Sequence, residues 1–183
     1  LLFNISGACY SEIGLIESAI TSFEKAISLK LDYAEAHYNL GVAFQKLLQL
    51  DKALEFYEKA ITFKHAYPGA HNNLGLIFLG RGQLDSSIKS FEWAIAYSPN
   101  YSEAIRNLGS ALQKINQFDE AKKQFEKVIS LDPKYAQAYE DLGILFNIIN
   151  RPNEALTYFE KALKVNPYLT NSYRNISKLI KFK

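Results

Sequence analysis

The 183-residue chain contains no methionine, one cysteine, one tryptophan and five prolines. The single cysteine, Cys9, excludes an intramolecular disulfide, and we expect it to be a small buried core residue. No apolar run of about 20 residues is present, which argues against a membrane-spanning helix. Because there is no initiator methionine, we expect the chain to be part of a longer protein.

The sequence also lacks a strong charge and the common catalytic motifs. The formal net charge is +2, so there is no electrostatic case for nucleic-acid binding. No HExxH, GxSxG, P-loop or GxGxxG pattern occurs. His37 and His71 are one full repeat apart, not four residues apart, which excludes a helical metal pair, and we expect them to be packing residues. We predict no catalytic residue, no metal site and no cofactor, and we predict that the chain is not an enzyme.

What the sequence does have is a fixed period of 34 residues. One glycine marks each period, at Gly7, Gly41, Gly75, Gly109 and Gly143. Small residues follow 12 and 19 positions later, and an aromatic residue follows 16 positions later, at Phe23, Tyr57, Phe91, Phe125 and Phe159. Small residues let two helices approach closely, and the aromatic ring fills the space between them. This pattern predicts one helix pair per period, stacked on copies of itself.

The combined spacing resembles the tetratricopeptide repeat family over nearly the whole chain. The resemblance implies an all-α fold, an α–α superhelix (solenoid) of five tandem helix-turn-helix repeats plus a C-terminal capping helix. We predict a single array over residues 1–183. Its parts are repeats at about 1–33, 34–67, 68–101, 102–135 and 136–168, and a C-terminal helix at 169–183.

The helix limits follow from the turn residues. We predict first helices near 1–12, 34–46, 68–80, 102–114 and 136–148. We predict second helices near 16–29, 51–64, 85–97, 119–131 and 153–165, and a last helix near 169–181. Gly14, Gly82, Asn116 and Asn150 tolerate the left-handed conformation that ends a helix. Asp51, Asp85, Asp119 and Asn153 are predicted to cap the second helices from just before their first turn.

A polar ladder is the main functional signal. The residues two positions before the repeat glycines are Asn39, Asn73, Asn107 and Asp141, and Asn175 continues the phase in the last helix. They adjoin the core leucines, so they lie off the core face. A carboxamide both donates and accepts hydrogen bonds and can pair with the peptide groups of an extended chain. Asp141 departs from the pattern because a carboxylate only accepts.

The ladder resembles the concave asparagine ladder of the O-linked N-acetylglucosamine transferase repeats, which implies contact with a peptide backbone in the groove. The alternative is that each asparagine bonds a neighbouring helix and stabilises the stack. The preceding position adds Tyr38, Asn72 and Arg106 as groove candidates. The third repeat is the least charged, and we expect it to hold an apolar side chain of a ligand near Gly69, Leu76, Leu79 and Gly80.

We therefore predict a protein–protein interaction module, a scaffold that binds an extended peptide or partner segment in its concave groove. The alternative is the substrate-presenting repeat region of a larger enzyme of the glycosyltransferase or sulfotransferase type, with its catalytic domain absent here. We expect a protein or peptide partner, no nucleic acid, no membrane and a cytoplasmic location. Leu1, Leu2 and Phe3 have no polar cap before them, which predicts self-association through the N-terminal end.

Overall fold

The structure, a computed structural model, describes the backbone of residues 1–181 and the side chains of residues 1–179. Within these residues it contains eleven α-helices and no strand, in agreement with the predicted all-α class. Residues 182 and 183 of the predicted last helix lie outside the described residues. The chain divides into two compact units, the first from Leu1 to Pro99 and the second from Asn100 onward. The prediction of one continuous array stays a prediction.

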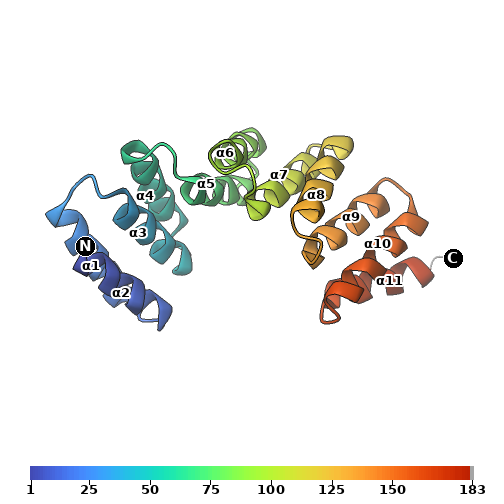
Figure 1. Ribbon diagram of the computed structural model, residues 1–183, viewed down its shortest axis with the longest axis horizontal. Helices are drawn as coiled ribbons and strands as arrows, with labels where there is room; N and C mark the ends of the chain where they lie inside the picture. Colours follow the sequence, from blue (N-terminus) through green and yellow to red (C-terminus); the bar gives the residue numbers. More distant parts are fainter. Residues whose placement is uncertain (182–183) are drawn as a thin grey trace. The chain divides into compact units, whose positions relative to one another are not determined.

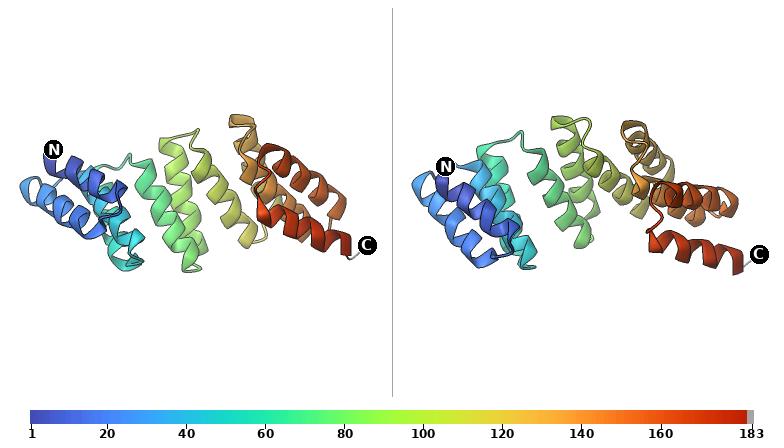
Figure 2. Two further views of the ribbon diagram at one scale, coloured as in Figure 1. Left: turned by 90° about the horizontal axis from the view of Figure 1, so that it is seen from below. Right: turned by 60° about the horizontal axis from the view of Figure 1, so that its bottom comes forward.

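Within each unit, helices that follow one another along the chain contact each other and lie side by side (Figures 1 and 2). Unit 1 contains α1 (Leu2–Glu12), α2 (Ile16–Leu29), α3 (Ala34–Lys46), α4 (Leu50–Phe63), α5 (Pro68–Gly80) and α6 (Leu84–Tyr97). Unit 2 contains α7 (Ser102–Lys114), α8 (Phe118–Leu131), α9 (Ala136–Ile148), α10 (Pro152–Val165) and α11 (Thr170–Lys181). We call the first helix of each repeat (α1, α3, α5, α7 and α9) an A helix and the second (α2, α4, α6, α8 and α10) a B helix.

The repeat glycine and the aromatic residue 16 positions later form the centre of each helix pair. A Cβ atom built on Gly75 would lie 2.5 Å from Cε1 of Phe91, and the other four repeat glycines face their own rings at 2.5 to 2.7 Å. All five rings are at most 1% exposed. The prediction that small residues and an aromatic ring together build the core is therefore confirmed.

The turns between the A and B helices use the left-handed conformation. Gly14, Gly82, Asn116 and Asn150 all have positive φ, as the sequence predicts. In the second repeat the same position holds Leu48, with φ of 58° and 82% of its surface exposed. A leucine in this conformation places its Cβ atom against backbone oxygen, which is unfavourable.

Two sequence predictions about local structure are wrong. The B helices begin one residue earlier than predicted in four repeats, so Asp51, Asp85, Asp119 and Asn153 lie inside the first turn and do not cap it. The three aspartates there face the positive end of the helix dipole. Cys9 is exposed. Its counterpart Ala43 is buried in α3, which contacts both the preceding helix α2 and the following helix α4, whereas α1 contacts the following helices α2 and α3 in the described residues.

His37 and His71 are buried and pack against aromatic rings, as predicted. Their ring centroids lie 5.2 Å from that of Phe63 and 5.5 Å from that of Tyr97, respectively. The Nε2 atom of His71 also lies 3.0 Å from the carbonyl oxygen of His65, six residues earlier, to which it donates a hydrogen bond. This bond fastens the loop before α5 to α5 itself.

Candidate functional site

The ladder residues bond to the preceding A helix of the same unit. We call the residues two positions before a repeat glycine the ladder position, and those three positions before it the partner position. A ladder residue bonds the partner residue 35 positions earlier in three cases. These are Asn39 with Asn4, Asn73 with Tyr38, and Asp141 with Arg106. The alternative interpretation of the ladder, that it ties neighbouring helices together, is therefore seen in the structure.

In unit 1 the network begins at Asn4, whose side chain is buried. The Nδ2 of Asn4 donates to Oε1 of Glu35 at 3.0 Å, and its Oδ1 accepts from Nδ2 of Asn39 at 3.0 Å. Asn4 is a donor on one side and an acceptor on the other, which fixes the orientation of its amide group. The side chain of Asn39 is thereby held in one direction while it stays half-buried.

Tyr38 lies at the middle of a tyrosine cluster. Its ring centroid is 4.8 Å from that of Tyr67 and 5.7 Å from that of Tyr57. Asn73 donates from Nδ2 to the hydroxyl of Tyr57 at 3.1 Å and more distantly to that of Tyr38 at 3.5 Å. Burial raises the pKa of Tyr57 and Tyr67 well above the usual value. These phenols therefore stay protonated and neutral in the physiological range.

Gly69, one of the residues expected to leave room for an apolar ligand side chain, does not itself open a pocket. A Cβ atom at Gly69 would lie 3.1 Å from the hydroxyl oxygen of Tyr38. The space at this glycine is occupied by Tyr38 of the preceding A helix. An open hollow of about 430 Å³ instead lies next to the cluster, and it is lined by Lys30, Asp32, Tyr33, Ala34, Glu35, Phe63, Lys64 and Tyr67.

In unit 2 the same two positions carry charge. Arg106 Nε and Nη2 donate to the two carboxylate oxygens of Asp141 at 2.5 and 3.1 Å. Burial by itself lowers the pKa of Arg106, but the hydrogen bond and charge of Asp141 outweigh it and raise the pKa. The pair is thus a fixed, fork-like ion pair between α7 and α9. The neighbouring Glu140 is buried and accepts a hydrogen bond from Ser172 of α11 at 2.7 Å.

The predicted site residues differ in exposure. Tyr38, Asn39, Asn73, Arg106 and Asn175 are half-buried, whereas Asn72, Asn107 and Asp141 are buried. The structure brings Tyr38 and Asn73 together in unit 1 and Arg106 and Asp141 together in unit 2. Asn175 lies on α11, where Ser172 makes the bond to Glu140.

Sequence reasoning missed the tyrosine directly before four of the A helices. Tyr33, Tyr67, Tyr101 and Tyr135 recur every 34 residues, eight positions before a repeat glycine. Tyr67 packs on Tyr38, and Tyr33 and Tyr67 line the hollow beside it. Their spacing in the sequence was a readable signal.

No group of three or more His, Cys, Asp or Glu side chains in residues 1–181 is placed to hold a metal ion. Over the same range, no helix combines the length and the apolar character needed to span a bilayer.

Models of tetratricopeptide repeats match the chain at residues 8–47, 34–67, 72–114 and 106–170. The chain therefore belongs to the tetratricopeptide repeat family, and its fold is the all-α solenoid of that family. Repeats of this family are typically interaction modules that bind protein or peptide partners and have no catalytic activity of their own. No curated protein matches the sequence significantly.

Several solved structures share the fold. PilF of Pseudomonas aeruginosa is 22% identical with a TM-score of 0.86, over 99% of this chain and 82% of that one. YrrB, described as a repeat protein with an unusual peptide-binding site, is 23% identical with a TM-score of 0.78, over 94% and 89%. MamA from Desulfovibrio magneticus is 19% identical with a TM-score of 0.82, over 92% and 96%.

Proposed function

We propose that this protein is an interaction scaffold that binds an extended segment of a partner protein along the A helices. The observation that carries the proposal is the state of Asn39 and Asn73. Both are half-buried and held by neighbours, and in the hydrogen bonds that the structure describes they act as donors through Nδ2. Their carbonyl oxygens can therefore accept from peptide N–H groups. Side chains fixed before binding lose little entropy when a ligand arrives.

The spacing of the ladder suits an extended chain. Neighbouring packed helices are about 8–10 Å apart, and an extended chain advances about 3.3 Å per residue. Asn39 of α3 and Asn73 of α5 would therefore meet peptide groups about three residues apart. Recognition of backbone groups tolerates many sequences. Side-chain selection would come from the hollow beside Tyr33 and Tyr67, because it offers aromatic rings and both signs of charge.

The test begins with selection of peptides from a random phage-displayed library on the immobilised protein. The affinity of the best synthetic peptide is then measured by fluorescence anisotropy. We expect Asn39→Ala with Asn73→Ala to weaken binding about tenfold or more, since each lost hydrogen bond contributes about 1 kcal/mol. Thr62→Ala on the exposed side of α4 is the matched control. Equal affinity of the double variant and the control, with intact circular dichroism, would disprove the proposal.

We infer further that the protein associates with a second copy of itself through α1. Leu2 and Ile5 of α1 and Ile13 directly after it form an apolar stripe with Cys9, and the three are 80%, 50% and 68% exposed. The later A helices carry a buried alanine at the position of Leu2. Leucine is too large for the close contact that alanine allows there. The surface of α1 is therefore less suited than that of the later A helices to pack against a preceding repeat. The stripe carries no charge, so two copies can face each other without repulsion.

Sedimentation velocity tests this inference. We expect a concentration-dependent dimer that is lost when Leu2 and Ile5 are changed to serine. We also expect oxidation to join two chains through a disulfide between their Cys9 residues. The control is the variant Cys9→Ser with Ser130→Cys, which places the cysteine at an exposed position of α8 and should form the disulfide less readily. A monomer at all concentrations would refute self-association and leave an upstream segment as the occupant of the stripe.

A further inference from the structure

The single tryptophan of the chain stands where the other repeats have lysine. Eighteen residues after each repeat glycine lies one residue of what we call the outer row, formed by Lys25, Lys59, Trp93, Lys127 and Lys161. All five are exposed or half-buried on the B helices. Trp93 is 53% exposed, so about half of its large apolar side chain lies at the surface. Part of the ring packs on the buried His71, and the rest of it lies at the surface.

Two lysines of the outer row pair with aromatic rings of their own helix. Nζ of Lys59 lies 4.8 Å from the ring centroid of Phe56, and Nζ of Lys161 lies 4.8 Å from that of Tyr158. Each ring comes three residues before its lysine. These are cation–π contacts, in which the electron-rich face of the ring attracts the ammonium group. The B-helix surface thus holds a ring and a cation together at two separate repeats.

In the third repeat the ring has moved to the outer-row position, and a lysine, Lys89, stands four residues before it. The residue three positions before Trp93 is Ser90, whose hydroxyl donates to the carbonyl oxygen of Ser86. Among the described residues, the ring contacts of Trp93 are with Tyr97 at 5.7 Å and His71 at 6.3 Å. Tyr97 stacks on the tryptophan with an angle of 20° between the rings. The stack holds Trp93 in place and leaves the rest of its surface open.

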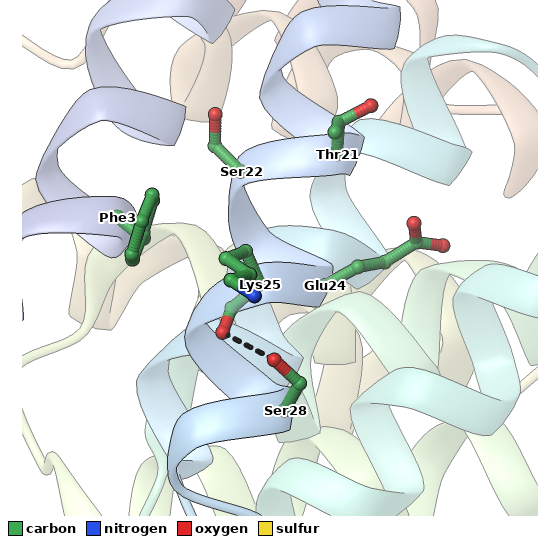
Figure 3. A pocket seen from close by; sticks show the side chains of 6 residues that line it. All are labelled: Phe3, Thr21, Ser22, Glu24, Lys25 and Ser28. Atoms are coloured by element: carbon green, nitrogen blue, oxygen red, sulfur yellow. Dashed lines mark hydrogen bonds between the residues drawn. The ribbon is translucent and has the colours of Figure 1, made fainter.

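A hollow accompanies the tryptophan. It measures about 420 Å³ and is lined by Lys89, Glu92, Trp93 and Ala96, one exposed stripe of α6. The first repeat has the matching hollow 68 residues earlier, shown in Figure 3, where Thr21, Glu24, Lys25 and Ser28 line it together with Phe3 and Ser22. In that view Lys25 lies between Phe3 and Glu24. The position that Lys25 fills with a cation is filled by a ring in the third repeat.

We propose that Trp93 is a second interaction site, which binds an arginine-bearing segment of a partner protein by stacking its guanidinium group on the exposed face of the indole. Glu92 and Lys89 line the same hollow, and Glu92 supplies the charge opposite to that of the guanidinium group. Arginine fits better than lysine because its planar group stacks on a ring and is weakly hydrated. Partly exposed tryptophan is also a residue type that dominates interface energies. This surface belongs to α6 and is separate from the A-helix ladder.

The test uses a labelled peptide of alternating glycine and arginine, with matched lysine, glutamate and serine peptides. Anisotropy gives the affinity, and the fluorescence of Trp93 reports contact, since the chain has no other tryptophan. We expect saturable binding of the arginine peptide, weaker binding of the lysine peptide, and a change in Trp93 emission. Trp93→Lys, which restores the residue of the other repeats, should weaken binding about tenfold, the size of a well-placed cation–π contact.

Three controls make the outcome decisive. Trp93→Phe should keep part of the affinity, and Glu92→Gln should reduce it severalfold. Lys161→Ala changes the same outer-row position in another repeat and should have no effect. The proposal is overturned if Trp93→Lys binds the arginine peptide as tightly as the natural protein, or if the serine peptide binds equally well. An arginine peptide that binds without changing Trp93 emission would also overturn it.

Discussion

Replacing Gly75 with alanine tests the central packing element of the repeat. The new Cβ atom would lie 2.5 Å from Cε1 and 2.7 Å from Cδ1 of Phe91, a ring with no exposed surface. Carbon atoms pack best at about 3.5–4.0 Å, so the buried ring must move by about 1 Å. Overpacking of this kind costs up to about 3 kcal/mol, and alanine returns about 1 kcal/mol through its helix propensity. The expected net loss in unfolding free energy is about 2 kcal/mol.

The same helix provides the control. Gly80 lies in α5, and apart from the adjoining backbone of its own helix nothing lies within 4 Å of its Cβ position. Gly80→Ala should therefore be neutral or raise stability by up to about 1 kcal/mol. Urea unfolding followed by the fluorescence of Trp93 reports this repeat directly. Equal midpoints for the two variants would refute the packing argument. Phe91→Leu should reduce the cost of Gly75→Ala, since the smaller side chain leaves room for the methyl group.

Three further substitutions have defined outcomes. Leu48→Asn should raise the unfolding free energy by about 1 kcal/mol, because it relieves the left-handed leucine, and urea titration measures the gain. Burial lowers the pKa of His71. The unfolding free energy should therefore fall as the pH decreases below about 6.5, because the unfolded chain gains the proton first. His71→Tyr should make the unfolding free energy, measured by urea titration, less dependent on pH. Asp141→Asn should cost about 1–3 kcal/mol because it removes the charge partner of Arg106, and an added Arg106→Asn should recover part of the loss in a double-mutant cycle.

The sequence was sufficient for the helices and the core because both depend on local spacing. The 34-residue period places each aromatic ring over a glycine of the same helix pair, and the four A helices from α3 to α9 have the predicted limits. The B-helix starts were missed by one residue because Leu50, Leu84, Phe118 and Pro152 already occupy the first helical position. The sequence prediction placed the cap at the polar residue that follows, which is Asp51, Asp85, Asp119 or Asn153.

The ladder was only partly readable from sequence. Its phase indicated an off-core position, and Asn39, Asn73 and Asp141 do lie between neighbouring A helices. The identity of each bonding partner depends on how one helix is aligned with the next, which no local pattern specifies. Cys9 was misjudged for a related reason, since its burial in other repeats comes from a neighbouring helix. Peptide contact by the ladder stays a prediction.

The bonds between positions 35 residues apart make the order of the repeats matter. The partner residue of one repeat must suit the ladder residue of the next, as Asn4 suits Asn39 and Arg106 suits Asp141. A tandem duplication of residues 102–135 would set the first copy of Arg106 beside a second copy of Asn107, an amide that cannot neutralise it. Repeats with interchangeable cores are thus not interchangeable modules, and each is matched to its successor. Recombination within this array is restricted by the polar side chains that join neighbouring A helices.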